Sequence, residues 1–146
     1  MSTPTQVDPR GLRVVAGITA VVLALVLVVP SQPVRVTLLA VQVAVFAIAT
    51  LIGLSSSPWA LLYARLVRPR LGPPAALEDA RPPRFAQAVG LTFTVIALVL
   101  LVAGATTAAL VATGLAFVAA LLNAAVGLCL GCELYLVLRR LSPDGA

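Results

Sequence analysis

The chain of 146 residues contains two cysteines, which lie close together as Cys129-Leu130-Gly131-Cys132. Residues three apart on a helix share a face with Cβ atoms about 5–6 Å apart, whereas a disulfide needs about 3.8 Å. A slight unwinding at Gly131, which has no Cβ, would bring the two sulfur atoms together. If a helix begins here, its N-terminal dipole favours a thiolate at Cys129. The motif therefore predicts a redox-active dithiol.

Two other interpretations of the cysteine pair stay open. The spacing is also half of a four-thiolate zinc site, but the sequence has no histidine and no second cysteine pair. A closed metal site would then need a second copy of the chain, and the sequence leaves the oligomeric state open. The thiols can instead act as small apolar side chains that fill a helix seam. We assign no metal and no cofactor to the chain.

Glu133 follows Cys132 directly and is a candidate proton acceptor during thiol exchange. The alternative is an ordinary interfacial carboxylate that pairs with Arg139 or Arg140. A helix that starts at the motif favours Cys129 as the attacking thiol, with a pKa below that of Cys132, which then resolves the mixed disulfide. If the preceding helix continues unbroken through the motif, Cys132 is the more accessible thiol. Because the cytosol keeps thiols reduced, we expect an exchanging pair there rather than a permanent disulfide.

The composition indicates that this motif belongs to a membrane protein. The chain is 61% hydrophobic and 10% charged, and its mean hydropathy is +1.10. A soluble domain of this size is about half apolar and a quarter charged. A helix that crosses a bilayer needs about 20 mostly apolar residues, and the sequence holds four such segments, at about 14–29, 36–54, 86–103 and 108–128. We predict an all-α, polytopic membrane protein with four transmembrane helices in a single membrane domain, residues 1–146.

The polar residues within these spans are few and neutral. They are Gln42, Thr50, Thr92, Thr94 and Asn123. We expect them to hold helices together rather than to bind a substrate. The lack of an ionisable residue at mid-span argues against a proton-coupled transporter or an ion pump.

The four spans are expected to form two hairpins, at about 14–54 and 86–128, which a linker at about 65–85 connects. Both hairpins begin with a proline-and-arginine segment and end with a glycine-containing one, and a tyrosine and arginines follow. Two spans per half make the repeats parallel, related by an axis along the membrane normal. The motif at 129–132 follows the second hairpin. A continuous helix from 108 to 140 would be about 50 Å long, so it must project, tilt or break at the motif.

Short interfacial helices should follow the second and fourth spans. Ser57 is a favoured N-cap, and Pro58 suits the first helical position. The next residues therefore predict a helix over 59–68, with Trp59 and Tyr63 at the level of the lipid headgroups. The equivalent segment in the second half is 133–140.

Arginine is the only basic residue type apart from the N-terminus, and all arginines except Arg35 flank the same side of the predicted spans. Short basic loops stay in the cytoplasm, so we expect both termini and the linker there. The absence of lysine suggests a high-GC bacterium, and hence the inner membrane. The net charge of +5 fits these flanks, and no nucleic-acid-binding motif accompanies it.

Three segments carry a resemblance to a known family. They are Val7-Asp8-Pro9-Arg10-Gly11, Arg84-Phe85-Ala86-Gln87 with Gly90, and Gly127-Leu128-Cys129-Leu130-Gly131-Cys132 with Tyr135. In these segments the chain resembles the bacterial family called domain of unknown function 4395, over nearly its whole length. One departure is Leu12-Arg13-Val14, where Pro-Arg-Phe is expected. The resemblance implies a small polytopic membrane protein without assigned activity. Members encoded near thioredoxin-like and sulfurtransferase proteins imply a thiol role.

Two functional hypotheses follow, and neither decides whether the chain is an enzyme. The first is thiol-disulfide exchange, as an electron or sulfur relay, between Cys129-Cys132 and a cytoplasmic thioredoxin-like or sulfurtransferase partner. The second is a structural or scaffolding membrane protein in which the cysteines only pack. A metal-binding membrane protein is a third, weaker alternative.

Overall fold

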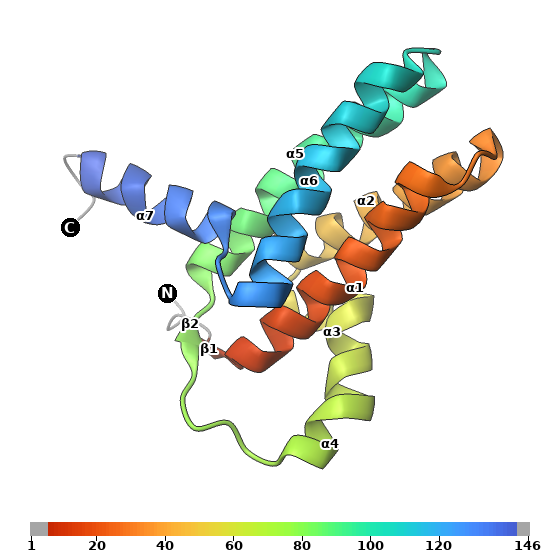
Figure 1. Cartoon of the computed structure of the whole chain (residues 1–146). Coiled ribbons are helices and arrows are strands. Elements are labelled where there is room, and N and C mark those ends of the chain that lie inside the picture. The colour runs from red at the N-terminus through yellow and green to blue at the C-terminus, as the bar shows by residue number, and fades with distance from the viewer. Residues whose placement is uncertain (1–5, 143–146) are drawn as a thin grey trace.

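Four long helices form the body of the protein, whose computed structural model describes residues 6–142. They are α1 (Pro9–Val28), α2 (Gln32–Leu51), α5 (Arg81–Val102) and α6 (Thr106–Val126). Each has 20 to 22 residues and is apolar enough to cross a membrane, as a multi-pass membrane protein requires. The α1–α2 and α5–α6 turns lie at one end of the bundle, and all other connections lie at the opposite end (Figure 1). The predicted all-α fold is confirmed; the predicted domain of residues 1–146 extends beyond the described residues.

Helix caps and early prolines fix where the long helices begin. Asp8 caps α1, and Ser31 caps α2 by accepting the N–H of Val34. Pro82 and Pro83 lie in the first turn of α5, where a missing N–H costs nothing because the first turn has no carbonyl partner. Helix therefore occupies both ends of the segment expected as a linker, and the part without helix runs from 72 to 80.

The helical path after α2 is broken at Ser57-Pro58, as predicted. After η1 (Leu54–Ser56, a 3-10 turn), Ser57 Oγ accepts the backbone N–H of Ala60 at 3.2 Å and caps α3 (Pro58–Leu62). The chain continues through η2 (Tyr63–Val67, a π-helical turn) and α4 (Arg68–Leu71). Trp59 donates its indole N–H to Gln42 Oε1 at 3.2 Å. This bond ties α3 to α2.

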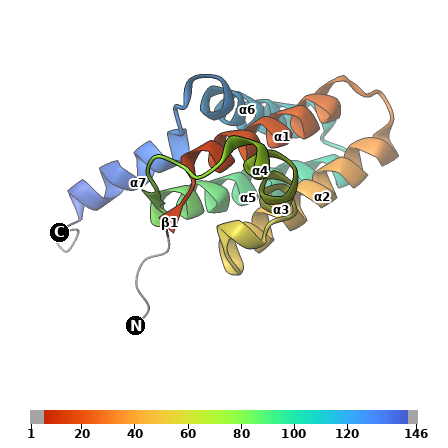
Figure 2. The same ribbon diagram turned by 90° about the horizontal axis from the view of Figure 1, so that it is seen from below.

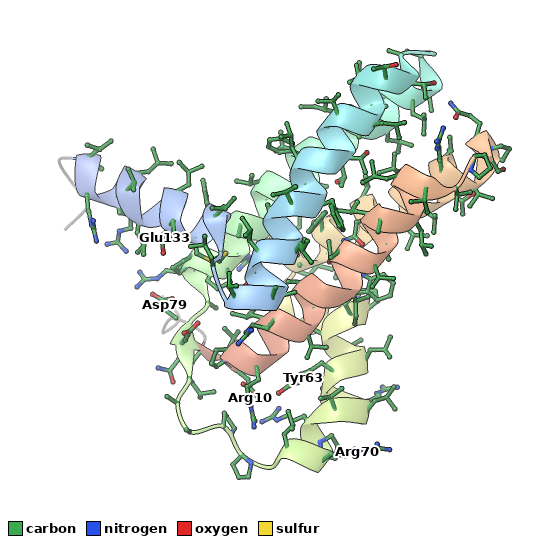
Figure 3. The ribbon with its side chains drawn as sticks, in the orientation of Figure 1. Arg10, Tyr63, Arg70, Asp79 and Glu133 are labelled. Carbon is green, nitrogen blue, oxygen red and sulfur yellow. A yellow bond between two sulfur atoms is a disulfide. The ribbon has the colours of Figure 1, made fainter. Side chains whose placement is uncertain are left out.

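The Tyr63 side chain is buried, contrary to the expectation of a place among lipid headgroups. Its ring lies against Gly11, where an added Cβ would meet ring carbon Cε1 at 2.9 Å. Its hydroxyl donates to Asp8 Oδ2 at 2.6 Å, and Asp8 also binds Arg10. Figure 3 labels Tyr63 and Arg10 at this site. Desolvation and the hydrogen bond to Asp8 raise the pKa of Tyr63. The expectation failed because the small Gly11 and the carboxylate of Asp8 make a fitted site on α1.

The two halves of the chain repeat each other in detail. Asp8 accepts the backbone N–H of Arg10 and pairs with its guanidinium at 3.0 Å. Asp79 does the same with Arg81, and their side chains approach to 2.8 Å. Strand β1 (Gln6–Val7) pairs antiparallel with β2 (Glu78–Asp79). The short strands at the two equivalent Asp-x-Arg segments thus pair with each other, which supports the predicted parallel repeat.

Each half also caps a helix of the other half through one arginine. Arg13 of α1 donates from Nη2 to the carbonyl oxygens of residues 124 and 125 at 3.1 and 3.0 Å, at the end of α6. Arg84 of α5 donates to the carbonyl oxygens of Thr50 and Leu51 at 2.7 and 3.3 Å, at the end of α2. These carbonyls have no partner within their own helix, and a cation complements the negative end of the helix dipole.

The packing follows the same crossed pattern. Helix α1 packs on α6 and α2 packs on α5 (Figure 1, Figure 2). The buried core near the end with the short turns is made by Leu23, Val26, Leu39, Ala97, Leu101 and Ala109. Large apolar side chains such as Val28, Val99 and Val111 are exposed on the outside of the bundle, which suits contact with lipid.

Candidate functional site

The fourth long helix ends just before the cysteine motif. Gly127 has a left-handed backbone with φ of 74° and donates its N–H to the Asn123 carbonyl at 3.0 Å. Such a glycine is the usual way to end a helix. A new helix, α7 (Leu130–Leu141), follows and leaves the bundle sideways (Figure 1). Among the alternatives of projecting, tilting and breaking, the structure therefore has the break.

Cys129 is the N-cap of α7. Its Sγ accepts the backbone N–H of Cys132 at 3.2 Å, and a disulfide joins the two residues with their Cα atoms 5.2 Å apart. Ser57 has the equivalent place at the start of α3, where its Oγ accepts the N–H of Ala60 at the same 3.2 Å. In the reduced protein this N–H and the helix dipole would both favour a thiolate at Cys129.

Two contacts seat the start of α7 on the start of α5. A Cβ added to Gly131 would lie 2.6 Å from both Cα and Cβ of Ala86, so only glycine allows this approach. One turn further, the rings of Tyr135 and Phe85 pack with their centroids 5.6 Å apart at 53°. The guanidinium of Arg139 lies 5.9 Å from the centroid of the Tyr135 ring. Packing on α5 therefore holds the cysteine pair in place.

Beyond these contacts, α7 has the character of an interfacial helix. One face carries exposed apolar side chains, namely Leu130, Leu134, Val137, Leu138 and Leu141. The charged residues Glu133, Arg139 and Arg140 lie on other faces of the helix. Such a distribution is typical of a helix that lies in the plane of a membrane surface.

Glu133, the candidate proton acceptor, is exposed in the first turn of α7 (Figure 3). Within residues 6–142, the salt bridges join Asp8 to Arg10 and Asp79 to Arg81, and Glu133 takes part in neither. The alternative interpretation of Glu133, as a partner of Arg139 or Arg140, has no salt bridge to support it among these. Its carboxylate is therefore available to water beside the cysteine pair.

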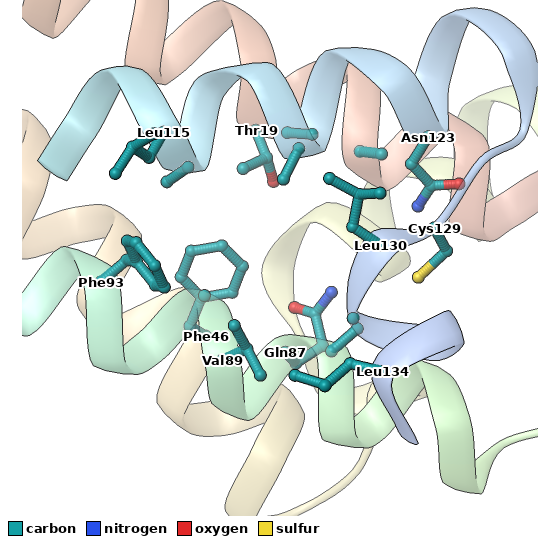
Figure 4. Close-up of a pocket in the computed structure, with 17 residues that line it drawn as sticks. Thr19, Phe46, Gln87, Val89, Phe93, Leu115, Asn123, Cys129, Leu130 and Leu134 are labelled. Atoms are coloured by element: carbon teal, nitrogen blue, oxygen red, sulfur yellow. The ribbon is translucent and has the colours of Figure 1, made fainter. Parts of the chain in front are cut away.

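A cavity of about 390 Å³ opens beside Cys129. Its walls come from α5, α6 and the start of α7, with contributions from α1 and α2, and most of them are apolar. Two carboxamides point into it from opposite walls, Gln87 on α5 and Asn123 on α6 (Figure 4). We had expected Asn123 only to hold helices together, and nothing in the sequence singled out Gln87. Only the packing of α7 on α5 brings these residues to Cys129.

A known protein family matches nearly the whole of the described chain. The family model described as Domain of unknown function (DUF4395) matches residues 7–140. The chain belongs to the DUF4395 family. No curated protein and no solved structure matches the chain. The DUF4395 match includes both Asp-x-Arg segments, the crossed arginine caps, the cysteine motif and nearly all of α7.

The DUF4395 structure brings Cys129 and Cys132 into one site and places Glu133 at its edge. Within the described range 6–142, no three histidine, cysteine, aspartate or glutamate side chains lie close enough together to hold a metal ion. A thiolate-bound zinc would therefore have to draw ligands from outside these residues. The arrangement is chemically suited to opening and closing one disulfide next to an apolar cavity.

Proposed function

We propose that this DUF4395 protein is a membrane thiol-disulfide exchange protein that works through Cys129 and Cys132. The observation that supports it best is the place of Cys129 at the N-terminus of α7, with the Cys132 N–H directed at its sulfur and the two sulfurs within bonding reach. A thiolate there is stabilised for attack, and its neighbour is placed to resolve the product.

The exchange needs no cofactor. The thiolate of Cys129 attacks a disulfide of the partner, a mixed disulfide forms, and one partner thiolate leaves. The Cys132 thiolate then attacks the Cys129 sulfur, which closes the disulfide of this protein and releases the second partner thiolate. In reverse, a partner dithiol reduces the Cys129-Cys132 disulfide. In this proposal the exposed carboxylate of Glu133 takes the proton that Cys132 loses on resolution.

We propose that the partner is a cytoplasmic thioredoxin-like or sulfurtransferase protein and that the membrane is the bacterial inner membrane. The bias of arginines toward the end of the bundle that carries α7 supports this orientation. Reporters fused after Gly72 or at the C-terminus should then read cytoplasmic, and one inserted at Ser31 should read external. Labelling of a cysteine introduced at Gly72 from outside intact cells would overturn the orientation.

The deciding experiment is trapping of a mixed disulfide in cells. Cys132→Ser should accumulate an adduct through Cys129, because the resolving thiol is missing, whereas Cys129→Ser should accumulate far less. The double variant, in which both cysteines are serine, is the matched control for non-specific capture. Titration of the wild-type pair in glutathione buffers should give one midpoint potential.

The second candidate function is a scaffold in which Cys129 merely caps α7. The equivalence with Ser57, which caps α3 with the same geometry, favours it. A scaffold predicts that Cys129→Ser is fully functional, since serine is the better cap. It also predicts no adduct in either single variant, and that outcome would replace the exchange hypothesis.

A further inference from the structure

The cavity beside Cys129 has the size and the lining of a ligand site. Its volume of about 390 Å³ falls within the range of about 300–1,000 Å³ that small-molecule pockets occupy. It extends from Cys129 along the membrane-spanning part of α5 to Phe93 (Figure 4). Phe93 lies six residues beyond Gln87 on one helix, about 9 Å deeper in the bundle. A ligand that fills this space reaches it from the bilayer.

The two carboxamides of the cavity lie at the end near the cysteines, and the Thr19 hydroxyl, which accepts a hydrogen bond from Gln42, lies further along it (Figure 4). The carboxamides of Gln87 and Asn123 point inward, and within residues 6–142 neither makes a hydrogen bond to another side chain or to the backbone. Both residues are half-buried, so their amides are open to a ligand that enters the cavity. Two N–H donors on opposite walls match a ligand with carbonyl oxygens at both ends of a flat head. The deeper walls, with Phe46, Phe93 and Leu115, suit a hydrocarbon tail.

We propose that this cavity binds an isoprenoid quinone of the bilayer, which accepts electrons from the reduced Cys129-Cys132 pair. The proposal rests on the proposed thiol exchange, and it names the class of electron acceptor. The quinone head would lie between Gln87 and Asn123 beside Cys129, and the quinone tail would pass Phe93 toward lipid.

The reaction balances with the quinone as the only oxidant. The two thiols lose two electrons and two protons, and the S–S bond between Cys129 and Cys132 forms. The quinone gains the two electrons and two protons at its oxygens and becomes a quinol, which leaves through the lipid. The dithiol of the soluble partner reduces the disulfide again. The net result is transfer of two electrons from a partner dithiol to the quinone pool.

A lipid acyl chain is the competing occupant, but it explains less of the site. It would satisfy the apolar walls and leave both amides without a partner. It would also give no reason for Cys129 to line the cavity. The repeat adds a further observation, because Gly131 holds the place that Trp59 has in the first half. The first half has a large side chain at this position, and the second half has a glycine that brings the start of α7, and with it Cys129, close to α5.

The test uses the full-length protein, reduced and freed of reductant in anaerobic nanodiscs. Decylubiquinone is added, and quinol absorbance and protein thiols are followed together. The wild type should form one quinol per disulfide. Gln87→Leu and Asn123→Leu should each react about tenfold more slowly, the cost of one buried hydrogen bond of about 1.4 kcal/mol. Thr92→Val, a change on the exposed side of α5, is the matched control and should react like the wild type.

Oxidised glutathione, which reaches the cysteines from water, separates the two proposals. If both glutathione and decylubiquinone oxidise the wild type and only the quinone reaction slows in the amide variants, the quinone site is supported. If glutathione oxidises the protein and decylubiquinone does not, the quinone proposal fails and thiol exchange stands. If neither oxidises it, both proposals fail.

A labelling experiment covers the case in which the amide variants do not fold. An azido-quinone is cross-linked to the wild type, with decylubiquinone or decanoic acid as competitor. Labelled peptides that contain Gln87 or Asn123, protected by decylubiquinone alone, support the site. Equal protection by decanoic acid would identify a lipid-chain cavity and overturn the proposal.

Discussion

Replacement of Asp8 by asparagine tests how the first helix is anchored. The Asp8 carboxylate accepts the N–H of Arg10 at 2.9 Å, pairs with its guanidinium at 3.0 Å and accepts the Tyr63 hydroxyl at 2.6 Å. Its side chain is only 9% exposed. The hydrogen bond from Arg10, followed by that from Tyr63, lowers the pKa of Asp8 from 3.8 to about 2. The charged form is therefore the one that holds α1 to η2.

The lowered pKa sets the magnitude of the effect. Each pKa unit corresponds to 1.36 kcal/mol, so the Asp8 charge contributes about 2 kcal/mol to folding at neutral pH. A group with a depressed folded-state pKa gives stability that is complete above its unfolded pKa and is lost as pH falls through its folded pKa. The contribution should thus decline from about pH 4 and vanish near pH 2. Asp8→Asn should lose it at neutral pH while it keeps the helix cap.

The assay is denaturant unfolding in mild detergent, followed by the fluorescence of Trp59, the single tryptophan, at pH 7 and at steps down to pH 3. The matched control is Asp79→Asn. Asp79 forms the equivalent pair with Arg81, but its side chain is 39% exposed, so its loss should cost under about 1 kcal/mol. Equal losses for the two variants, or a gap between wild type and Asp8→Asn that persists unchanged at low pH, would refute the reasoning.

Three further predictions concern the cysteine site and the repeat. Gly131→Ala should push α7 off α5 at a cost of about 1–3 kcal/mol. It should also slow the formation of the Cys129-Cys132 disulfide after reduction, measured by timed alkylation. Gly114→Ala, which has open space around it, should leave the rate of disulfide formation unchanged. The single-cysteine variant that keeps Cys129 should be alkylated faster at neutral pH than the variant that keeps Cys132. The reverse order would identify Cys132 as the nucleophile. Arg13→Gln and Arg84→Gln should each reduce the unfolding free energy by about 0.3–1 kcal/mol, because each removes charge-assisted bonds to a helix end at an exposed site. A loss in only one variant would contradict their equivalence.

Local patterns were enough to predict the helices and their breaks. The four apolar segments and the Ser57-Pro58 cap depend on residues within one or two turns of each other, whereas the break before Cys129 was one of three alternatives that the sequence left open. The repeat could also be found, because both halves carry a proline-and-arginine segment before an apolar run; the equivalence of Asp8 and Asp79 comes from the structure. Such features express backbone hydrogen bonding and hydropathy, which the sequence displays directly.

The contacts between halves could not be predicted in this way. Arg13 was assigned to a basic flank, yet it caps a helix more than a hundred residues further along the chain. Tyr63 was assigned to the headgroup region, yet it is buried against Gly11. Gln87 reaches the cysteine site only because α7 folds back onto α5. Each of these depends on how the helices cross, and a hydropathy pattern specifies which residues are apolar without specifying which helices touch.

Comparison of the two halves distinguishes the features that the fold requires from those that are specific to the cysteine site. A capped break after the second and the fourth long helix is common to both halves, so a polar cap at this place is structural. Ser57 fulfils that need with a hydroxyl, and Trp59 two residues later reaches across to Gln42. The second half meets the same need with the Cys129 sulfur and puts Gly131 where the tryptophan would be. Gly131 is explained by packing, because Ala86 of α5 occupies the place of its side chain. A thiol in place of the better cap is hard to explain by stability, and it is what an oxidisable pair would require.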